Sequence, residues 1–262
     1  MNPVTFQHRD GIAHVCLSRP EKHNAFDDQM VNEMTEIFIM AKNNPDIRIL
    51  ILASKGPNFC AGADLQWMKR MATFSQQENN DDAMALANML KALNHIPKPT
   101  IAQIHGSVYG GGVGLVACCD IAIAADNTQF CLSEVRLGLS PATIAPYVIK
   151  AIGARQARRY FLTAEKFSAQ KAMALNLVHE VCPADQISHT IDRVTEKLLA
   201  GGPQALGIAK QLVQNIDCYS TENLPQMTAD IIANQRTSQE AKQGLQSFFD
   251  RRKPPWVPTR SS

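Results

Sequence analysis

The chain has 262 residues, of which 45% are hydrophobic, 19% charged and 6% aromatic, and its formal net charge at pH 7 is +2. This composition is typical of a globular protein and excludes both a disordered chain and a small fold built on disulfides. Because the charges nearly balance, we expect no nucleic-acid partner and no attachment to a membrane surface.

The seven cysteines form no C-x-x-C pair, and the adjacent Cys118 and Cys119 lack the spacing of a zinc ligand pair. We therefore expect reduced thiols, no metal site and a cytoplasmic protein. The first ten residues lack the apolar stretch of a secretory signal, and no apolar run is long enough for a membrane span. These observations also favour the cytoplasm.

The first half of the chain alternates short apolar runs with helical periodicity, which is typical of an α/β protein. Asp27 or Asp28 is expected to cap a helix that ends before Pro45, and Pro97 ends a second helix. The predicted strands are 12–17, 48–53, 100–104, 121–125 and 129–132, with further helices at 83–94 and 114–118.

From about residue 142 the pattern becomes almost wholly helical, and no flexible linker separates the two parts. Ser168 is the expected cap of one of these helices. The predicted helices are 142–151, 154–162, 168–175, 186–199, 203–215, 221–235 and 238–249.

Five of the fourteen glycines lie within nine positions, directly after the strand 100–104. A glycine turn at a helix start exposes unpaired N–H groups, which can bind an anion or a developing oxyanion. Two other interpretations stay open. One is close helix packing, and the other is a weak dinucleotide fingerprint formed by Gly112, Gly114 and Ala117. The five glycines are Gly106, Gly110, Gly111, Gly112 and Gly114.

A second turn of small residues follows the buried strand 48–53. Ala61, Gly62 and Ala63 precede Asp64, which is expected to cap a helix. Two such turns after different strands can direct two backbone N–H groups at one oxygen, which is the geometry of an oxyanion hole.

An oxyanion hole needs a partner that transfers protons. Asp120, Asp126 and Glu134 are the acids between Pro97 and Ala164, and the first two have structural explanations beside a strand and in a turn. Glu134 stands among apolar neighbours, where desolvation would raise its pKa toward that of a general acid or base. The alternative is an ion pair with Arg136 or an N-cap role.

Several ordered motifs together resemble the enoyl-CoA hydratase/isomerase (crotonase) family over nearly the whole chain. They are RPEKHNAF (19–26), FCAGADL (59–65), GSVYGGGVGL (106–115), CDIAIAA (119–125) and LSEVRLGL (132–139). The resemblance implies an α/β fold with a spiral core of ββα turns and a C-terminal helical trimerisation region. One unit would span 1–262, with the core at about 1–195 and the helical region at about 196–262, assembled as a homotrimer or a dimer of trimers.

The resemblance also implies a binding site for an acyl-CoA thioester. Coenzyme A would be part of the substrate, with no separate cofactor. The backbone N–H groups of Ala63 and Gly111 would hold the thioester carbonyl, and Phe248 and Arg251 would reach the coenzyme A of a neighbouring subunit. The pocket within one subunit would be lined by Lys22, His23, Ala25, Ala61, Asp64 and Leu65.

Typical hydratases of the family activate water with two glutamates, of which the second matches Glu134 and the first falls at Gly114. The family's Δ3,Δ2-enoyl-CoA isomerases use one glutamate. Residues 110–125 and 139–165 look most like bacterial methylglutaconyl-CoA hydratases of leucine and acyclic-terpene breakdown. We therefore expect hydration of an enoyl-CoA such as 3-methylglutaconyl-CoA. The alternatives are isomerisation and a CoA-ester-binding protein without activity.

Overall fold

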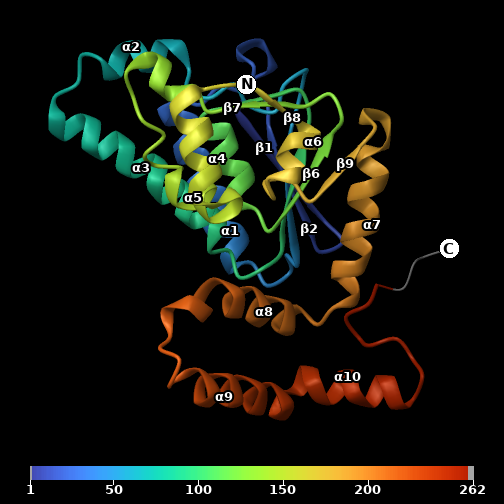
Figure 1. Ribbon diagram of the computed structural model, residues 1–262. Coiled ribbons are helices and arrows are strands. Elements are labelled where there is room, and N and C mark those ends of the chain that lie inside the picture. Colours follow the sequence, from blue (N-terminus) through green and yellow to red (C-terminus); the bar gives the residue numbers. More distant parts are fainter. Residues whose placement is uncertain (1, 259–262) are drawn as a thin grey trace. The chain divides into compact units, whose positions relative to one another are not determined.

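The computed structural model describes residues 2–258 (Figure 1). It contains two compact units, each described here by itself. Unit 1 comprises Met1–Ile96 and Thr100–Ile191, and unit 2 comprises Pro97–Pro99 and Asp192–Ser262. Unit 1 mixes helices and strands whereas unit 2 is helical, so the expected change of pattern along the chain is confirmed. A single family unit divided near residue 195 stays a prediction.

Six strands form the main sheet of unit 1, in the order β1-β2-β3-β4-β6-β9. The first pair is antiparallel and all others are parallel. β3 is fully buried over its first four residues, as is usual for a parallel strand covered on both faces. The strands are β1 (Val4–Arg9), β2 (Ile12–Leu17), β3 (Ile49–Ser54), β4 (Thr100–Ile104), β6 (Ile121–Ala125) and β9 (Glu180–Cys182).

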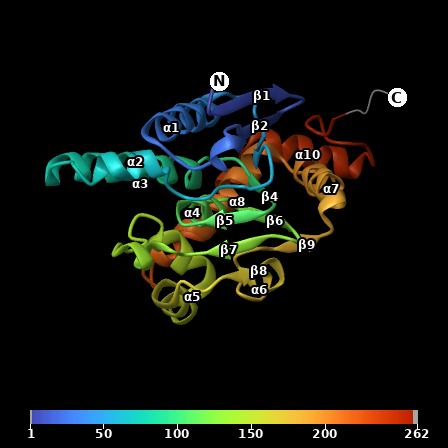
Figure 2. The same cartoon turned by 90° about the horizontal axis from the view of Figure 1, so that it is seen from above.

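A second, smaller sheet has the order β5-β7-β8. β5 (Ser107–Tyr109) and β7 (Gln129–Cys131) are parallel, with Tyr109 opposite Cys131. β8 (Phe167–Ser168) pairs antiparallel with β7. In Figure 2, β1 lies at one side of unit 1 and β8 at the other.

Three helices of unit 1 begin at caps that the sequence predicts. Asp27 accepts from Met30 N at 2.9 Å, and Asp64 and Ser168 cap the helices that follow them. Helix α1 buries Val31, Met34, Phe38 and Ala41, whose spacing predicts a helical face, and it also buries Met30. The helices are α1 (Asp28–Asn43), α2 (Leu65–Met71), α3 (Gln76–Asn94), α4 (Gly111–Cys118), α5 (Ala145–Thr163), α6 (Ala169–Ala174) and α7 (Ile187–Ala200), which crosses into unit 2.

Some element bounds differ from the prediction. α3 begins well before residue 83, because Ser75 and Glu78 form a capping box that starts the helix. α4 begins at Gly111 rather than 114. The two helices predicted at 142–151 and 154–162 are one element with a break at Gly153, whose φ is 75°. β5, β8 and β9 were not predicted, because they have at most three residues each, which are too few to show the alternation of apolar and polar residues of a strand.

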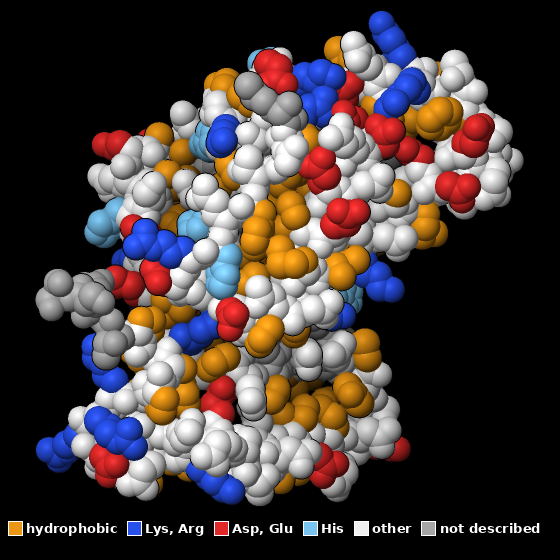
Figure 3. Space-filling model, turned by 180° about the vertical axis from the view of Figure 1, so that it is seen from behind, with side chains coloured by type: hydrophobic (Ala, Val, Ile, Leu, Met, Phe, Trp, Pro, Cys, Tyr) orange, Lys and Arg blue, Asp and Glu red, His pale blue; other side chains and the backbone are white. Residues whose placement is uncertain are grey.

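Unit 2 contains α8 (Pro203–Asn215), α9 (Leu224–Thr237) and α10 (Gln239–Phe249). The Glu240 carboxylate of α10 accepts from the N–H groups of Gln204 and Ala205 at the start of α8, at 2.9 Å each. No helix in residues 2–258 is both long and apolar enough to cross a bilayer. On the face shown in Figure 3, basic and acidic side chains are interspersed.

Candidate active site

The two turns of small residues meet in unit 1. Cys60 N donates to Ser107 O at 3.1 Å, and Tyr109 N donates to Cys60 O at 2.8 Å. At Gly62, where φ is +92°, an added Cβ would lie 3.2 Å from Tyr109 O and 4.0 Å from Gly110 Cα. Only glycine accommodates this approach without strain. The structure therefore brings together the segments that the sequence singled out separately.

Each turn presents one unpaired backbone donor. Phe26 N donates to Gly62 O at 2.7 Å and Asp64 N donates to Phe26 O at 2.6 Å. This bridge uses the atoms on either side of Ala63, so the Ala63 N–H points away from Phe26. Gly111 is the first residue of α4, where an N–H has no partner within the helix. Within residues 2–258, neither N–H has a protein acceptor.

Glu134 lies beside this pair of turns. It begins the 3₁₀ helix η2 (Glu134–Leu137), which follows β7. Gly110 N donates to Cys131 O at 2.9 Å, and an added Cβ on Gly110 would lie 3.2 Å from Glu134 Oε1. The carboxylate therefore lies next to the residue that precedes the Gly111 donor.

Glu134 is half-buried, and one oxygen of its carboxylate is fully buried. Its Oε2 has no hydrogen-bond partner among the described residues. Burial raises the pKa of Glu134, and a bond from its own backbone opposes this shift. Arg136 instead donates to Ala164 O at 2.8 Å, and no ion pair joins it to Glu134 in the described chain. The raised pKa expected from the sequence is confirmed, and the ion-pair alternative is wrong.

The other acids have the structural roles expected of them. Asp120 Oδ2 accepts from Thr100 N at 2.8 Å and from Thr100 Oγ1 at 2.9 Å. No group of His, Cys, Asp and Glu side chains in residues 2–258 has the arrangement of a metal site. Cys60 is buried, and burial raises the pKa of its thiol to about 12, which favours the packed, protonated form over a thiolate.

The sequence model described as "Enoyl-CoA hydratase/isomerase" matches residues 7–259. The chain belongs to this family. Its fold agrees with solved structures of the family, so the predicted crotonase fold class is confirmed. The family acts on acyl-CoA thioesters. An enoyl-CoA hydratase from Shewanella pealeana is 42% identical, with a TM-score of 0.94 over 97% of this chain and 96% of that one.

Other relatives extend the comparison. AtuE of Pseudomonas aeruginosa is 31% identical, with a TM-score of 0.95 over 98% of this chain and all of that one (100%). An enoyl-CoA hydratase of Alternaria alternata is 34% identical over 208 residues, which cover 78% of this chain and 67% of that protein.

In this crotonase, Gly114 faces a filled space. An added Cβ would lie 2.3 Å from Ile144 Cγ2 and 2.9 Å from Ile144 Cβ. Ile144 is 1% exposed and stands directly before α5. The position that matches the family's first glutamate is therefore sealed by a packed side chain. Gly112 is similar, since an added Cβ would lie 2.9 Å from Cys60 Cβ. Close packing thus explains two glycines of the cluster, and a dinucleotide loop explains neither.

We expect Gly114→Ala to destabilise the protein by about 1–3 kcal/mol, because an added methyl overpacks the space held by Ile144. The double variant Gly114→Ala/Ile144→Ala should recover part of this loss, since it returns volume at the point of contact. Urea unfolding of the two variants and of Ile144→Ala measures the coupling. Additive effects would contradict the contact.

The residues expected to line the coenzyme A pocket surround the Ala63 turn. Lys22 Nζ lies 2.9 Å from Asp64 Oδ2, and His23 Nδ1 lies 2.9 Å from Asn58 Nδ2. Ala61 N donates to His23 O at 3.0 Å. Ala25 is buried whereas Leu65 is 75% exposed. A cleft of about 530 Å³ is lined by Lys22, Asp27, Asp28, Gln29, Asp64, Gln66, Trp67 and Arg70.

Phe248 and Arg251 belong to unit 2. Phe248 is 77% exposed, and Arg251 is also exposed, with φ of 53°. Their predicted contact with the coenzyme A of a neighbouring subunit stays a prediction, as does assembly into a trimer or hexamer.

Sequence reasoning missed several residues that build the site. Phe26 pairs with Ala63, and its Cε2 would lie 2.5 Å from a Cβ on Gly111. Asn24 is fully buried, and its amide donates to Lys55 O and Asn58 O at 2.8 Å each. Both stand in the motif RPEKHNAF, so a buried Asn followed by a large apolar residue was the available signal.

Proposed function

We propose that the protein hydrates the 2,3 double bond of an enoyl-CoA. The observation that carries this proposal is the half-buried Glu134, whose carboxylate Oε2 is buried without a hydrogen-bond partner, beside the two unpaired N–H groups of Ala63 and Gly111. Burial raises the pKa of this carboxyl, which is the direction that favours a general acid or base near neutral pH. The two donors supply the electrostatic stabilisation that an enolate oxygen needs.

In the proposed reaction, both N–H groups donate to the thioester carbonyl and draw electrons from C3. Ionised Glu134 takes a proton from water as the oxygen bonds to C3, and the electrons of the double bond move to the carbonyl oxygen. The enolate then collapses, and the proton passes from Glu134 to C2. The product carries one added water, and Glu134 returns to its starting state.

Isomerisation by the same site is the alternative. Glu134 would take a proton from C2 of a 3-enoyl-CoA and return it to C4, without water. Isomerisation needs only one glutamate. At Gly114, the position matching the family's first glutamate, Ile144 fills the space that a side chain would take. A CoA-ester-binding protein without activity is the remaining candidate.

One panel separates the three candidates. Crotonyl-CoA, 3-methylglutaconyl-CoA and a 3-enoyl-CoA are incubated with the protein, and products are identified by mass and by ultraviolet absorption. Hydration adds the mass of water and removes conjugation, whereas isomerisation of the 3-enoyl-CoA creates conjugation without a change of mass. Binding of all three thioesters without any product would overturn both enzymatic proposals.

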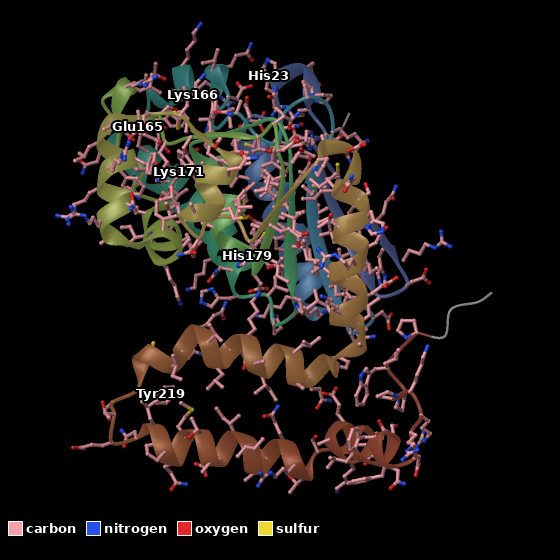
Figure 4. The ribbon with its side chains drawn as sticks, turned by 45° about the vertical axis from the view of Figure 1, so that its right-hand side comes forward. His23, Glu165, Lys166, Lys171, His179 and Tyr219 are labelled. Atoms are coloured by element: carbon pink, nitrogen blue, oxygen red, sulfur yellow. The ribbon has the colours of Figure 1, made fainter. Side chains whose placement is uncertain are left out.

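We further propose that the acyl group carries a carboxylate, as in 3-methylglutaconyl-CoA. Arg136 Nη2 and Cys131 Sγ both donate to Ala164 O, at 2.8 and 3.3 Å. Lys166 Nζ lies 5.5 Å from the centre of the Tyr109 ring. Neither cation has a carboxylate within ion-pair distance in the described chain. Figure 4 shows Lys166 at the same end of unit 1 as His23 and away from His179.

Arg136→Gln and Lys166→Gln test this substrate class, with Lys171→Gln in α6 as a control. We expect kcat/KM for 3-methylglutaconyl-CoA to fall about tenfold, the value of one charge-assisted contact. The rate with crotonyl-CoA should stay unchanged, since it has no second anionic group. Equal losses with both substrates would show that the cations bind the coenzyme A phosphates instead. If kcat/KM falls with neither substrate, Arg136 and Lys166 do not contribute to the binding site.

A further inference from the structure

One guanidinium group joins the starts of two helices beside the Ala63 turn. Arg19 Nη1 contacts Asp27 Oδ2, and Arg19 Nη2 lies 3.4 Å from Asp64 Oδ2. The side chains of Arg19, Asp27 and Asp64 are 11%, 19% and 7% exposed. Charges this far removed from water require close pairing to be tolerated, so the bridge constrains its three members.

Both carboxylates also cap helices. Asp27 Oδ1 accepts from Met30 N at 2.9 Å and starts α1. Asp64 Oδ1 accepts from Gln66 N at 2.8 Å and from Trp67 N at 3.2 Å, and starts α2. Each aspartate therefore uses one oxygen for its helix and the other for Arg19. The planar guanidinium can serve two carboxylates at once in a fixed geometry.

The backbone bridge between Phe26 and Ala63 lies directly before these two caps. Phe26 is followed by Asp27, and Ala63 is followed by Asp64, so the caps and the bridge share adjacent peptide groups. The ring of Phe26 also packs where a Cβ of Gly111 would stand, 2.5 Å from Cε2. Phe26 thus contacts both residues whose N–H groups are unpaired.

The backbone of Arg19 is fixed by two hydrogen bonds with Asn24. Arg19 N donates to Asn24 Oδ1 at 2.8 Å, and Arg19 O accepts from Asn24 N at 2.9 Å. Asn24 is fully buried and has φ of +54°, a conformation that asparagine tolerates better than most residues. The bridge therefore starts from a rigid turn, not from a flexible loop.

We propose that Arg19 is a positioning residue that sets the direction of the Ala63 N–H relative to the Gly111 N–H. This role rests on the proposed function, because it matters only where both donors bind one carbonyl oxygen. Lys22 also contacts Asp64 Oδ2, at 2.9 Å, and is more exposed at 37%. It supplies charge to one carboxylate only, whereas Arg19 connects two.

Arg19→Lys tests the proposal because it keeps the positive charge but removes the planar guanidinium that contacts two carboxylates at once. We expect kcat to fall about 100-fold, the typical cost of displacing a catalytic group by ~1 Å. The Kd of an unreactive saturated acyl-CoA should change little, because that ligand gains least from carbonyl polarisation. Arg159→Lys is the matched control, since Arg159 makes two contacts with the exposed Glu165, at 2.5 and 3.1 Å.

A spectroscopic measurement separates positioning from a general loss of structure. An aryl-conjugated enoyl-CoA absorbs at longer wavelength when its carbonyl is polarised, so the shift on binding reports the two donors directly. We expect a clear shift with the unmodified protein and a smaller one with Arg19→Lys and Asp64→Asn, at saturating ligand. Circular dichroism selects the folded variants.

The outcomes distinguish the two proposals. Absence of a shift in the unmodified protein would overturn the oxyanion site itself, and with it the proposed function. A full shift in both the unmodified protein and Arg19→Lys, with unchanged kcat, would overturn the role of Arg19 alone. If Arg19→Lys does not fold, Asp64→Asn gives the same decision, because it removes the bridge from the side of the Ala63 turn.

Discussion

Replacing Glu134 with glutamine is expected to lower the hydration rate by about 10²–10⁴-fold, the usual contribution of a positioned acid or base. The amide has nearly the same shape but can neither take a proton from water nor return it to C2. Because the two N–H donors are unchanged, the Kd for a saturated acyl-CoA should stay within the error of measurement. Steady-state kinetics on crotonyl-CoA and 3-methylglutaconyl-CoA measure the loss.

The pH profile of the unmodified protein provides a second measurement on the same group. Since burial raises the pKa of Glu134 from its usual value of 4.5, the ionised base is lost while the pH is still above that value. We therefore expect kcat/KM to fall on the acid side with a midpoint above 4.5. Glu165→Gln is the control, because Glu165 is paired with Arg159. An unchanged rate in Glu134→Gln would exclude Glu134 as the acid–base group.

The second large effect is expected for Gly111→Ala. Its new methyl would lie 2.5 Å from Phe26 Cε2 and 3.1 Å from Phe26 Cδ2, well inside normal contact distance. Either the ring or the start of α4 must move. Movement of α4 displaces the Gly111 N–H, one of the two donors proposed for the oxyanion site, and loss of a single donor typically lowers kcat by about 10²–10³-fold. We expect a loss in that range.

A matched control separates this effect from general destabilisation. Gly244 also lies in a helix and faces an aromatic ring, with an added Cβ 3.0 Å from Trp256 Cη2. Gly244→Ala should therefore disturb packing without touching either donor. The comparison is made on kcat and on the absorption shift of the bound aryl-enoyl thioester. Equal losses in the two variants would attribute the Gly111 effect to stability alone.

Short-range sequence patterns, namely apolar runs and helix caps, predicted the strands and helix starts that depend on neighbouring residues. β2, β4 and β6 are short, mostly apolar runs, and their observed bounds match the prediction. β3 differs by one residue. β1 was missed because VTFQHR carries few apolar residues and is only half buried along its length. The start of α3 was missed because a polar capping box, rather than apolar spacing, determines it.

The same distinction holds for the site. Glu134 and the two glycine-containing turns were found because burial, charge and backbone exposure are visible in short windows of sequence. Arg19 was quoted only as part of a motif, since nothing local indicates that it joins an aspartate 45 positions away. Ile144 was missed for the same reason, because its contact with Gly114 is created by packing between distant segments.

The partnerless oxygen of Glu134 has a consequence for protein engineering. Below the usual pKa of a glutamic acid the carboxyl is neutral in both the folded and unfolded chain, so the folded protein does not have to bury a charge. As the pH rises through the raised pKa, only the folded protein must hold a desolvated charge, and the free energy of unfolding falls. A screen for thermal stability at neutral pH would therefore enrich replacements of Glu134. Directed evolution of a more stable variant must consequently measure enzymatic turnover as well as thermal stability.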